Sequence, residues 1–540
     1  MIWTSEALFA HGLLPAPKRV PIPGAPEHLG VLLDAALAKV PEQEAIIGRY
    51  DRLTFRELEA RANAGAAFLR ELGVGEGVRV ACCAANDAEI VVAFLAVQRL
   101  GAIWIGINRN LGPGEKLYLL RDCGARVFLA EQPFAQQAEE GRSDLPELRA
   151  LVRLGATDAE NQWAPALRRL AGARRPDVEI DPWAPAAIAY TSGTTGFPKG
   201  AVHSQHNILL AATISEHMAI DRRPEVIRGT ASPLTILNFM ILGPVATLAR
   251  GARTVCMDRT DAAGVAEWIA RERINTTSLV PTIVKDLLTR PDIDPESLSS
   301  LTWIVIGAAM VPEGLPALYR ARFGHAPTIG YGLTEQPTAV TRTHDKTPPV
   351  HGAIGRPLPH LQVSMLDAQD QEVPRSTAGE ICVRAVAQGA WADVYTPTLG
   401  YWNKPEATAA LLRNGWMHTG DIGIMDAAGE VFIQDRRSNL IVRGGANVYP
   451  AEVERVLRQE RRVYDCAVIG RPDERLGQTV AAVIQPAANV PTEGLVEDLE
   501  VLCAREIARY KIPVQWRVVD ELPRNALGKV IRAELQRMFE

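Results

Sequence analysis

Apolar and polar positions near the start of the chain alternate in a way that predicts a parallel sheet. Residues 54–57, Thr-Phe-Arg-Glu, form a capping box, in which the hydroxyl and the carboxylate satisfy exposed amides at a helix start. The pattern predicts a helix from there to residue 72. A β-like run at 78–84, a helical stretch opened by residues 86–87 and a second β-like run at 102–107 follow. This βαβ order implies parallel strands.

The same alternation recurs at 187–190 and 303–306, so about the first 330 residues predict doubly wound α/β structure. Further on, short alternating strands separated by Gly and Pro turns predict a small β-barrel-like subdomain. The fold class is therefore α/β. We expect a large N-terminal domain over 1–437, with doubly wound α/β subdomains and a β-rich subdomain at about 348–434, followed by a small α+β C-terminal domain over 438–540.

Composition excludes several classes of protein. The 540 residues are 47% hydrophobic and 22% charged with a net charge of -5, which predicts a multidomain globular protein without a nucleic-acid-binding surface. The seven cysteines form no CxxC pair, so we expect reduced, mostly buried thiols in a cytoplasmic protein. The N-terminus lacks signal-peptide features, and the most apolar stretch, 236–249, is shorter than the run of about 20 residues that a membrane span requires.

Residues 190–200, Tyr-Thr-Ser-Gly-Thr-Thr-Gly-Phe-Pro-Lys-Gly, have the chemistry of a phosphate-binding loop. Glycines let backbone amides turn toward an anion, hydroxyls add neutral donors, and the lysine adds charge. At about 4 Å, a lysine and one phosphate charge attract each other by roughly 4 kcal/mol. The Walker A pattern is absent, because Gly528-Lys529 is followed by Val530. A polar surface loop is the structural alternative, and the apolar strand directly before the loop argues against it.

These residues resemble the adenylate-forming superfamily, which includes acyl-CoA synthetases, luciferases and the adenylation domains of peptide synthetases. Residues 191–200 match its hallmark loop TSGTTGxPKG throughout. Further signatures follow in the family's order at 331–335, 419–421, 435–436 and 523–529. The resemblance implies an enzyme that uses ATP and Mg²⁺ to convert a carboxylic acid into its acyl-AMP.

The resemblance also implies roles for individual residues. Those expected to bind ATP and pyrophosphate are Thr191, Ser192, Gly193, Thr194, Thr195, Gly196 and Lys199. Those expected to bind adenine and ribose are Gly307, Ala308, Ala309, Tyr331, Gly332, Asp421 and Arg436. Thr334 would face the α-phosphate, and Glu335 would hold Mg²⁺ through its carboxylate. Lys529 would bridge the substrate carboxylate and the α-phosphate as charge develops.

In the family a mobile C-terminal domain rotates about a hinge two residues after the ribose-binding arginine. That position is Ser438 here, where many relatives have Asp or Lys. Gly444 and Gly445 resemble the segment that lines the pantetheine tunnel of CoA ligases, although a turn before a helix fits them equally well.

The acid substrate is predicted only by class. Many aryl and fatty acyl ligases have a histidine in the segment equivalent to 233–239, and this chain has none. Asn238, Phe239 and Gly330 are expected to line the acyl pocket, and no basic residue is evident for a second carboxylate. These features favour a largely apolar monocarboxylic acid that is medium-chain, alicyclic or aromatic.

Three functional hypotheses remain open at this point. The first is an acid:CoA ligase, with CoA as the acyl acceptor. The second keeps adenylation but uses an amine or an acyl-carrier protein as the acceptor. The third is a nucleotide-binding protein without chemistry, against which the presence of Glu335, Asp421 and Lys529 argues. A homodimer is suggested by analogy with relatives only.

Overall fold

The computed structural model divides into two compact units. The first contains Met1–Val363 and Cys382–Thr419, and the second contains Ser364–Ile381 and Gly420–Glu540. The predicted boundary at 437/438 falls on residues that the structure does not describe, so it stays a prediction. The structure describes residues 3–155, 161–191, 197–219, 223, 225–307, 309, 311–312, 314–343, 352–436, 439–443, 446–524 and 530–540.

A seven-stranded sheet in the first unit contains the βαβ structure expected from the sequence. Its strands in spatial order are β18 (Gly400–Tyr401), β8 (Lys199–Ser204), β7 (Pro185–Thr191), β4 (Ile103–Gly106), β3 (Arg79–Cys83), β5 (Val127–Glu131) and β6 (Ala150–Leu154). β3 and β4 pair in parallel, with α4 (Ala88–Gln98) between them in the chain. Asp87 caps this helix, as the pattern predicts.

A nine-stranded sheet forms the second layer of strands in the same unit. Its strands in spatial order are β15 (Arg356–Pro357), β14 (Gln336–Arg342), β13 (Thr328–Leu333), β12 (Trp303–Ile306), β11 (Thr276–Leu279), β9 (Ile227–Thr230), β10 (Arg253–Cys256), β1 (Glu44–Ile47) and β2 (Arg52–Thr54). The strands from β13 to β1 pair in parallel. Their carboxyl ends therefore share one edge of the sheet.

The edges of both sheets contain antiparallel pairs, which the βαβ pattern in the sequence does not predict. β1–β2, β13–β14, β14–β15, β7–β8 and β8–β18 are antiparallel pairs. β18 comes from the segment expected to form the β-rich subdomain, yet it adds to the edge of the first sheet. A two-residue strand carries no periodicity, so only tertiary pairing reveals where it belongs.

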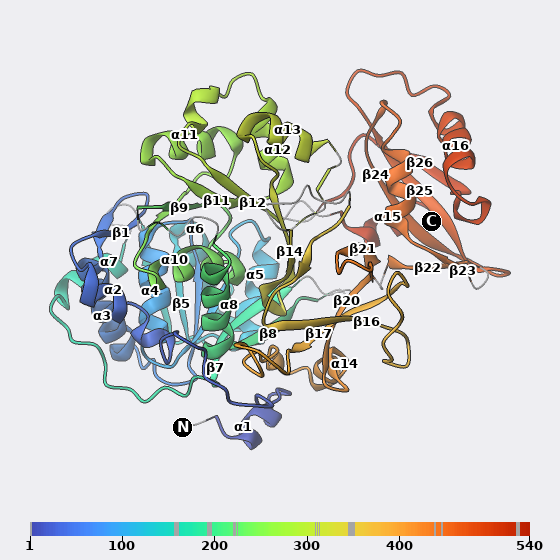
Figure 1. Ribbon diagram of the computed structural model, residues 1–540. Helices are drawn as coiled ribbons and strands as arrows, with labels where there is room; N and C mark the ends of the chain where they lie inside the picture. The colour runs from blue at the N-terminus through green and yellow to red at the C-terminus, as the bar shows by residue number, and fades with distance from the viewer. Residues whose placement is uncertain are drawn as a thin grey trace. The chain divides into compact units, whose positions relative to one another are not determined.

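Helices cover the sheets of the first unit and also lie between them. α8 (Gln205–His217) contacts both β8 and β14, which belong to different sheets, and it packs on α10 (Ala246–Ala249) in Figure 1. α3 (Phe55–Glu71) starts at the predicted capping box, which is present. The remaining helices of this unit are α1 (Ser5–Ala10), α2 (Asp34–Lys39), α5 (Pro113–Cys123), α6 (Gln132–Glu140), α7 (Trp163–Arg169), α9 (Leu237–Met240), α11 (Ala262–Glu272), α12 (Pro281–Thr289), α13 (Leu315–Phe323) and α14 (Pro405–Leu411).

The β-rich subdomain and the small α+β part are also present. One five-stranded sheet contains β16 (Leu361–Leu366), β17 (Gly379–Ala385), β19 (Leu412–Arg413), β20 (Trp416–Met425) and β21 (Val431–Arg436). Another contains β22 (Ile441–Arg443), β23 (Ala446–Val448), β24 (Val463–Asp473), β25 (Gly477–Pro486) and β26 (Gln515–Val518). α15 (Pro450–Leu457) and α16 (Leu495–Glu506) pack apolar residues against the latter, and α17 (Arg532–Arg537) follows near the end of the chain.

The cysteines confirm the expectation from their spacing. All seven are unpaired and buried. Burial raises the pKa of the Cys83 and Cys123 thiols to about 12. Among the described residues, every helix is too short or too polar to cross a membrane.

Gly106 allows the segment before α9 to approach β4 closely. A Cβ atom on this residue would lie 1.9 Å from the carbonyl oxygen of Thr235, which is backbone and cannot rotate away. Gly75 contrasts with it, because a Cβ atom there would meet nothing within 4 Å.

We expect Gly106→Ala to lower the free energy of unfolding by ~1–3 kcal/mol, the usual cost of overpacking. Chemical denaturation of the variant and the parent would measure the difference. Gly75→Ala is the matched control and should change stability little. Equal losses in the two variants would contradict the close contact as the cause.

Three buried histidines stay neutral in the folded first unit. Burial lowers the pKa of His203 and His206 to about 4 and that of His360 to about 3. In the unfolded chain histidine titrates at about 6.5, so below that pH the unfolded state binds more protons than the folded state. Their contribution to stability is therefore complete above pH 6.5 and is lost as the pH falls toward 4.

We expect His203→Gln to flatten the dependence of unfolding free energy on pH between 6 and 4.5 by about 1 kcal/mol per pH unit, because one buried neutral base is removed. Denaturant titrations across this range would show the change. A titration at pH 8, where the histidine is neutral in both states, gives the stability lost with the hydrogen bond alone and serves as the baseline. Parallel curves for the variant and the parent would disprove the assignment.

Candidate active site

The predicted phosphate loop connects two strands of a hairpin. β7 ends at Thr191 and β8 begins at Lys199, and these two residues are Cα partners in the antiparallel ladder. The ladder places Lys199 beside Thr191 at the base of the loop. The rest of the loop lies outside the described residues, namely Ser192, Gly193, Thr194, Thr195 and Gly196.

Tyr401 connects the lysine of this hairpin with the predicted metal-binding glutamate. β18 pairs with β8 so that Tyr401 lies opposite Ala201. The Lys199 ammonium lies 5.4 Å from the centroid of the Tyr401 ring, where a cation is attracted to the aromatic face. The Tyr401 hydroxyl donates a 2.6 Å hydrogen bond to Glu335 Oε1. One aromatic side chain thus contacts both Lys199 and Glu335, and its hydroxyl fixes one carboxylate oxygen.

The backbone around Glu335 is held by two side chains from other elements. Thr334 and Glu335 form the tight turn between β13 and β14, because Leu333 and Gln336 are Cα partners. Asn238 Nδ2 donates a 3.2 Å hydrogen bond to the carbonyl of Leu333. His203 Nε2 donates a 2.9 Å hydrogen bond to the carbonyl of Thr334. The orientation of this turn therefore depends on α9 and β8.

The residue after the turn is also fixed by hydrogen bonds. The Gln336 side chain is fully buried, and its amide oxygen accepts a 2.6 Å hydrogen bond from the Tyr395 hydroxyl. Its Nε2 donates to Thr338 Oγ1 at 2.6 Å. Burial raises the pKa of Tyr395, so this hydroxyl remains a donor. The start of β14 is thereby anchored independently of Glu335.

His203 contributes a neutral donor to the site. It lies on the same face of β8 as Lys199, because alternate residues of a strand share a face. Its low pKa, caused by burial, keeps the ring uncharged, so Nε2 carries the proton that the Thr334 carbonyl accepts. Within the described part of the chain, Nδ1 has no hydrogen-bond partner. Lys199 is therefore the positive group on this face of the strand.

Three of the predicted adenine-binding residues, Gly307, Tyr331 and Gly332, lie on or directly after the neighbouring strands β12 and β13. Gly307 follows β12 directly, and a Cβ atom there would lie 3.1 Å from the carbonyl oxygen of Gly330. Tyr331 is 8% exposed, and Gly332 lies beside Thr338 of β14. Ala309 is exposed, and Ala308 lies outside the described residues. The strands thus bring Gly307, Gly330 and Tyr331 to one edge of the sheet.

The predicted acyl-pocket residues Asn238 and Phe239 are half-buried on the short helix α9. A π-helical turn, Ile241–Val245, follows directly and contains Pro244. Through Asn238, this helix contacts the turn that carries Glu335, while Gly330 lies on β13 beside Gly307.

In the second unit, the ribose-binding pair predicted from the sequence occupies neighbouring strands. Asp421 on β20 and Arg436 on β21 are Cα partners in an antiparallel ladder. Asp421 is 4% exposed. At the preceding residue, the amide of Gly420 donates a 3.0 Å hydrogen bond to Glu380 Oε1. The backbone therefore brings together two residues that lie 15 positions apart in the sequence.

Ser438, Gly444, Gly445 and Lys529 lie outside the described residues. The segment containing Lys529 is bounded by Arg524 and Val530, which form an isolated antiparallel bridge.

Tyr401, His203 and Tyr395 contact the site and were not expected from the sequence. The alternation along 199–203 offers a signal for His203, because it places that residue on the same face as Lys199. Tyr401 has no local signal, since it reaches Glu335 through the pairing of β18 with β8. Tyr395 similarly reaches Gln336 only in the folded chain.

The chain is similar to known ligases and synthetases over nearly its whole length. The chain is 33% identical over 526 residues to the indoleacetate–CoA ligase of Aromatoleum aromaticum, covering 95% of this chain and 96% of the relative. The solved structure of the anthranilate CoA ligase AuaEII with anthranoyl-AMP is similar with a TM-score of 0.84 at 27% identity, covering 96% of this chain and 98% of that chain. The amide bond synthetase McbA from Marinactinospora thermotolerans is similar with a TM-score of 0.81 at 26% identity, covering 95% and 100%.

Two family descriptions match the chain in the order of its motifs. The AMP-binding enzyme family matches residues 33–390, and the AMP-binding enzyme C-terminal domain matches residues 452–529. The first match includes the phosphate-loop hairpin and Glu335, and the second ends at Lys529. The chain therefore belongs to the AMP-binding enzymes of the adenylate-forming superfamily, as its motifs predicted.

Proposed function

We propose that the protein is an ATP-dependent acid:CoA ligase. It activates a largely apolar carboxylic acid as acyl-AMP with release of pyrophosphate, and then transfers the acyl group to coenzyme A with release of AMP. The observation that carries the adenylation step is the contact of Tyr401 with both Lys199 and Glu335 at the base of the glycine-rich loop. These contacts connect the cation at the base of the loop with a carboxylate, which supports binding of phosphate groups together with a metal ion.

In the first step, a carboxylate oxygen of the acid attacks the α-phosphorus of ATP, and the bond to pyrophosphate breaks. No protein nucleophile is required, so catalysis rests on positioning and on neutralising negative charge. Lys199 neutralises the outer phosphates, and the Thr334 hydroxyl contacts the α-phosphate. Lys529 neutralises charge between the two reacting groups during this step.

Glu335 has the chemistry to hold Mg²⁺. Mg²⁺ in nucleotide enzymes is commonly bound by one or two carboxylates together with substrate phosphates. Tyr401 engages only Oε1 of this carboxylate among the contacts of the described residues, so the geometry suits a ligand role for Glu335. When bound, the ion would supply positive charge to the phosphates that leave as pyrophosphate.

The substrate class is inferred from the acyl-pocket segment and from the relatives. Asn238 and Phe239 present one amide and one aromatic ring on α9, and the segment around them is apolar. The named relatives that form CoA thioesters act on indoleacetate and anthranilate, which are aromatic acids. These features favour an apolar monocarboxylic acid, with aromatic acids tested first.

An amine is the second candidate acceptor of the acyl group. The similarity to an amide bond synthetase favours an amine as the alternative acceptor. Gly444 and Gly445, which are proposed to admit the CoA thiol, lie in a part of the chain that the structure does not describe. Adenylation is common to both hypotheses, so only dependence on the acceptor separates them.

We expect the purified protein, given Mg-ATP, CoA and a panel of carboxylic acids, to form AMP and the acyl-CoA of an apolar acid, as detected by mass spectrometry. Lys529→Ala is the matched control and should lose about 10² to 10³ in acyl-AMP formation. Acyl-AMP that persists with CoA but is consumed by an amine would replace the CoA ligase proposal with an amide synthetase.

We expect Tyr401→Phe to raise the Mg²⁺ concentration needed for half-maximal acyl-AMP formation, or to lower the adenylation rate, by ~10- to 100-fold. This is the scale of losing one hydrogen bond to a charged group. The variant keeps the ring beneath Lys199 and removes only the donor to Glu335.

Tyr395→Phe provides a comparison, because it removes a buried tyrosine hydroxyl that bonds Gln336 rather than Glu335. It should lower stability while leaving the Mg²⁺ requirement close to that of the parent. If the two variants shift the Mg²⁺ requirement equally, Tyr401 has no specific role toward Glu335.

A further inference from the structure

An arginine-rich pocket lies in the first unit, at the amino ends of three parallel strands. β9 begins at Ile227, β10 begins at Arg253, and β11 begins directly after Asn275. The pocket has a volume of about 420 Å³, and five of its ten lining residues are arginines. This volume falls in the range of small-molecule sites.

The pocket is separate from the candidate active site. Gly307 and the turn containing Glu335 lie at the carboxyl ends of β12 and β13. β9 to β13 pair in parallel, so the amino ends of β9, β10 and β11 lie at the opposite edge of the sheet. A ligand in the pocket would therefore not overlap the proposed nucleotide site.

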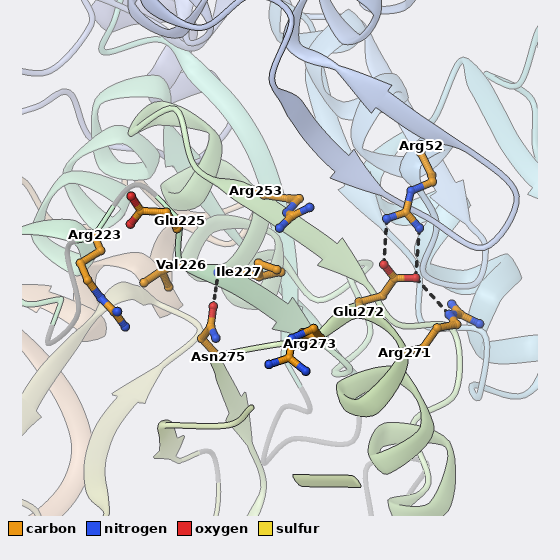
Figure 2. Close-up of a pocket in the computed structure, with 10 residues that line it drawn as sticks. All are labelled: Arg52, Arg223, Glu225, Val226, Ile227, Arg253, Arg271, Glu272, Arg273 and Asn275. Atoms are coloured by element: carbon orange, nitrogen blue, oxygen red, sulfur yellow. Dashed lines mark hydrogen bonds and ion pairs between the residues drawn. The ribbon is translucent and has the colours of Figure 1, made fainter. Parts of the chain in front are cut away.

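Two carboxylates hold three of the arginines in fixed positions. Arg52 donates to Glu44 at 2.7 Å and to Glu272 at 2.9 Å and 3.2 Å. Arg253 donates to Glu44 at 2.8 Å, and Arg271 donates to Glu272 at 3.0 Å. Figure 2 shows the bonds from Arg52 and Arg271 converging on Glu272 at one side of the pocket. The guanidinium groups are therefore ordered before any ligand binds.

The positive charges exceed the negative ones. The five arginines face Glu225 and Glu272 in the lining, and Glu44 is bound to two of them. Arg223 apart, the other four arginines exceed the three carboxylates by one positive charge. A concave surface with an excess of one charge focuses its field and concentrates counter-ions.

Arg273 differs from the other lining arginines in its backbone conformation. It is the C-cap of α11 in the left-handed conformation, with φ 52° and ψ 46°, where glycine is the favoured residue. Its side chain is exposed, and within the described part of the chain it has no hydrogen-bond or ion-pair partner. Figure 2 shows it beside Asn275, and Arg253, which also lines the pocket, comes from a different element. An unfavourable backbone conformation is thus occupied by an arginine whose donors have no partner among the described residues.

We infer that this pocket binds a small oligophosphate anion such as pyrophosphate. Guanidinium groups bind phosphate oxygens through paired N–H donors, and several of them suit a multiply charged anion. The ten described lining residues include no aromatic side chain, so the pocket offers no surface on which a base would stack. This composition favours the phosphate groups themselves over a nucleotide.

The structural alternative is that these arginines only stabilise the fold. Cations complement the partial negative charge at the C-terminus of a helix, and α11 ends at this pocket. That account explains Arg271, which also stacks 3.6 Å from the Trp268 ring. It does not explain why an arginine occupies position 273, where the left-handed backbone conformation favours glycine.

Arg273→Gly separates these two accounts. Glycine relieves the backbone conformation, so the variant should fold with an unchanged or higher Tm while losing one guanidinium. Arg126→Gln is the matched control for charge, because Arg126 precedes β5 in the other sheet and lies 4.0 Å from Glu147. Pyrophosphate binding would be measured by calorimetry without Mg²⁺ on the full chain.

We expect saturable pyrophosphate binding by the parent, at least tenfold weaker binding by Arg273→Gly and by Arg253→Gln, and unchanged binding by Arg126→Gln. Binding that persists in Arg273→Gly but disappears in Lys199→Ala would assign the anion to the nucleotide loop and overturn this proposal. No saturable binding, or binding to anionic phospholipid vesicles without binding to pyrophosphate, would overturn it as well. The proposed adenylation is unaffected by any of these outcomes.

Discussion

The turn between β13 and β14 is the constraint on which the candidate active site depends. Parallel pairing carries β13 to the same sheet edge as β12, and the antiparallel return of β14 forces Thr334 and Glu335 into a two-residue turn. Neutral donors from α9 and β8 hold the two carbonyls of this turn, and the Tyr401 hydroxyl holds the carboxylate. Every one of these donors is uncharged, so they orient the turn and the carboxylate without forming an ion pair with Glu335.

The sequence was sufficient to predict those elements whose structure depends on residues close together in the chain. The capping box at Thr54, the parallel pair β3 and β4, and strand β12 all follow from short-range patterns of polarity and from turn residues. Each of these patterns arises within one helix or strand and the element that follows it, so residues close together in the sequence contain the signal. The strand before the hallmark loop was likewise predicted, because an apolar run leads directly into the loop, whereas the strand that follows the loop, β8, was not predicted.

The contacts that orient the site could not be predicted in this way. Tyr401 meets Glu335 because a two-residue strand from a distant segment joins the edge of a sheet. Such pairing depends on the assembled surface and leaves no periodicity in the sequence. The same limit applies to the arginine pocket, where Arg52, Arg253 and Arg273 come from three separate elements. Lys529, the catalytic residue expected from the last motif, lies outside the described residues, so its role stays a prediction.

The burial of every cysteine provides a way to detect when part of this protein opens. Alkylating reagents react with the thiolate at an accessible sulfur, and here the side chains are covered. The cysteines are distributed over both compact units, with Cys82 and Cys256 in the first and Cys466 and Cys503 in the second. Each unit therefore contains intrinsic reporters of its own opening, and the position of a modified cysteine would identify which part of the chain had become exposed.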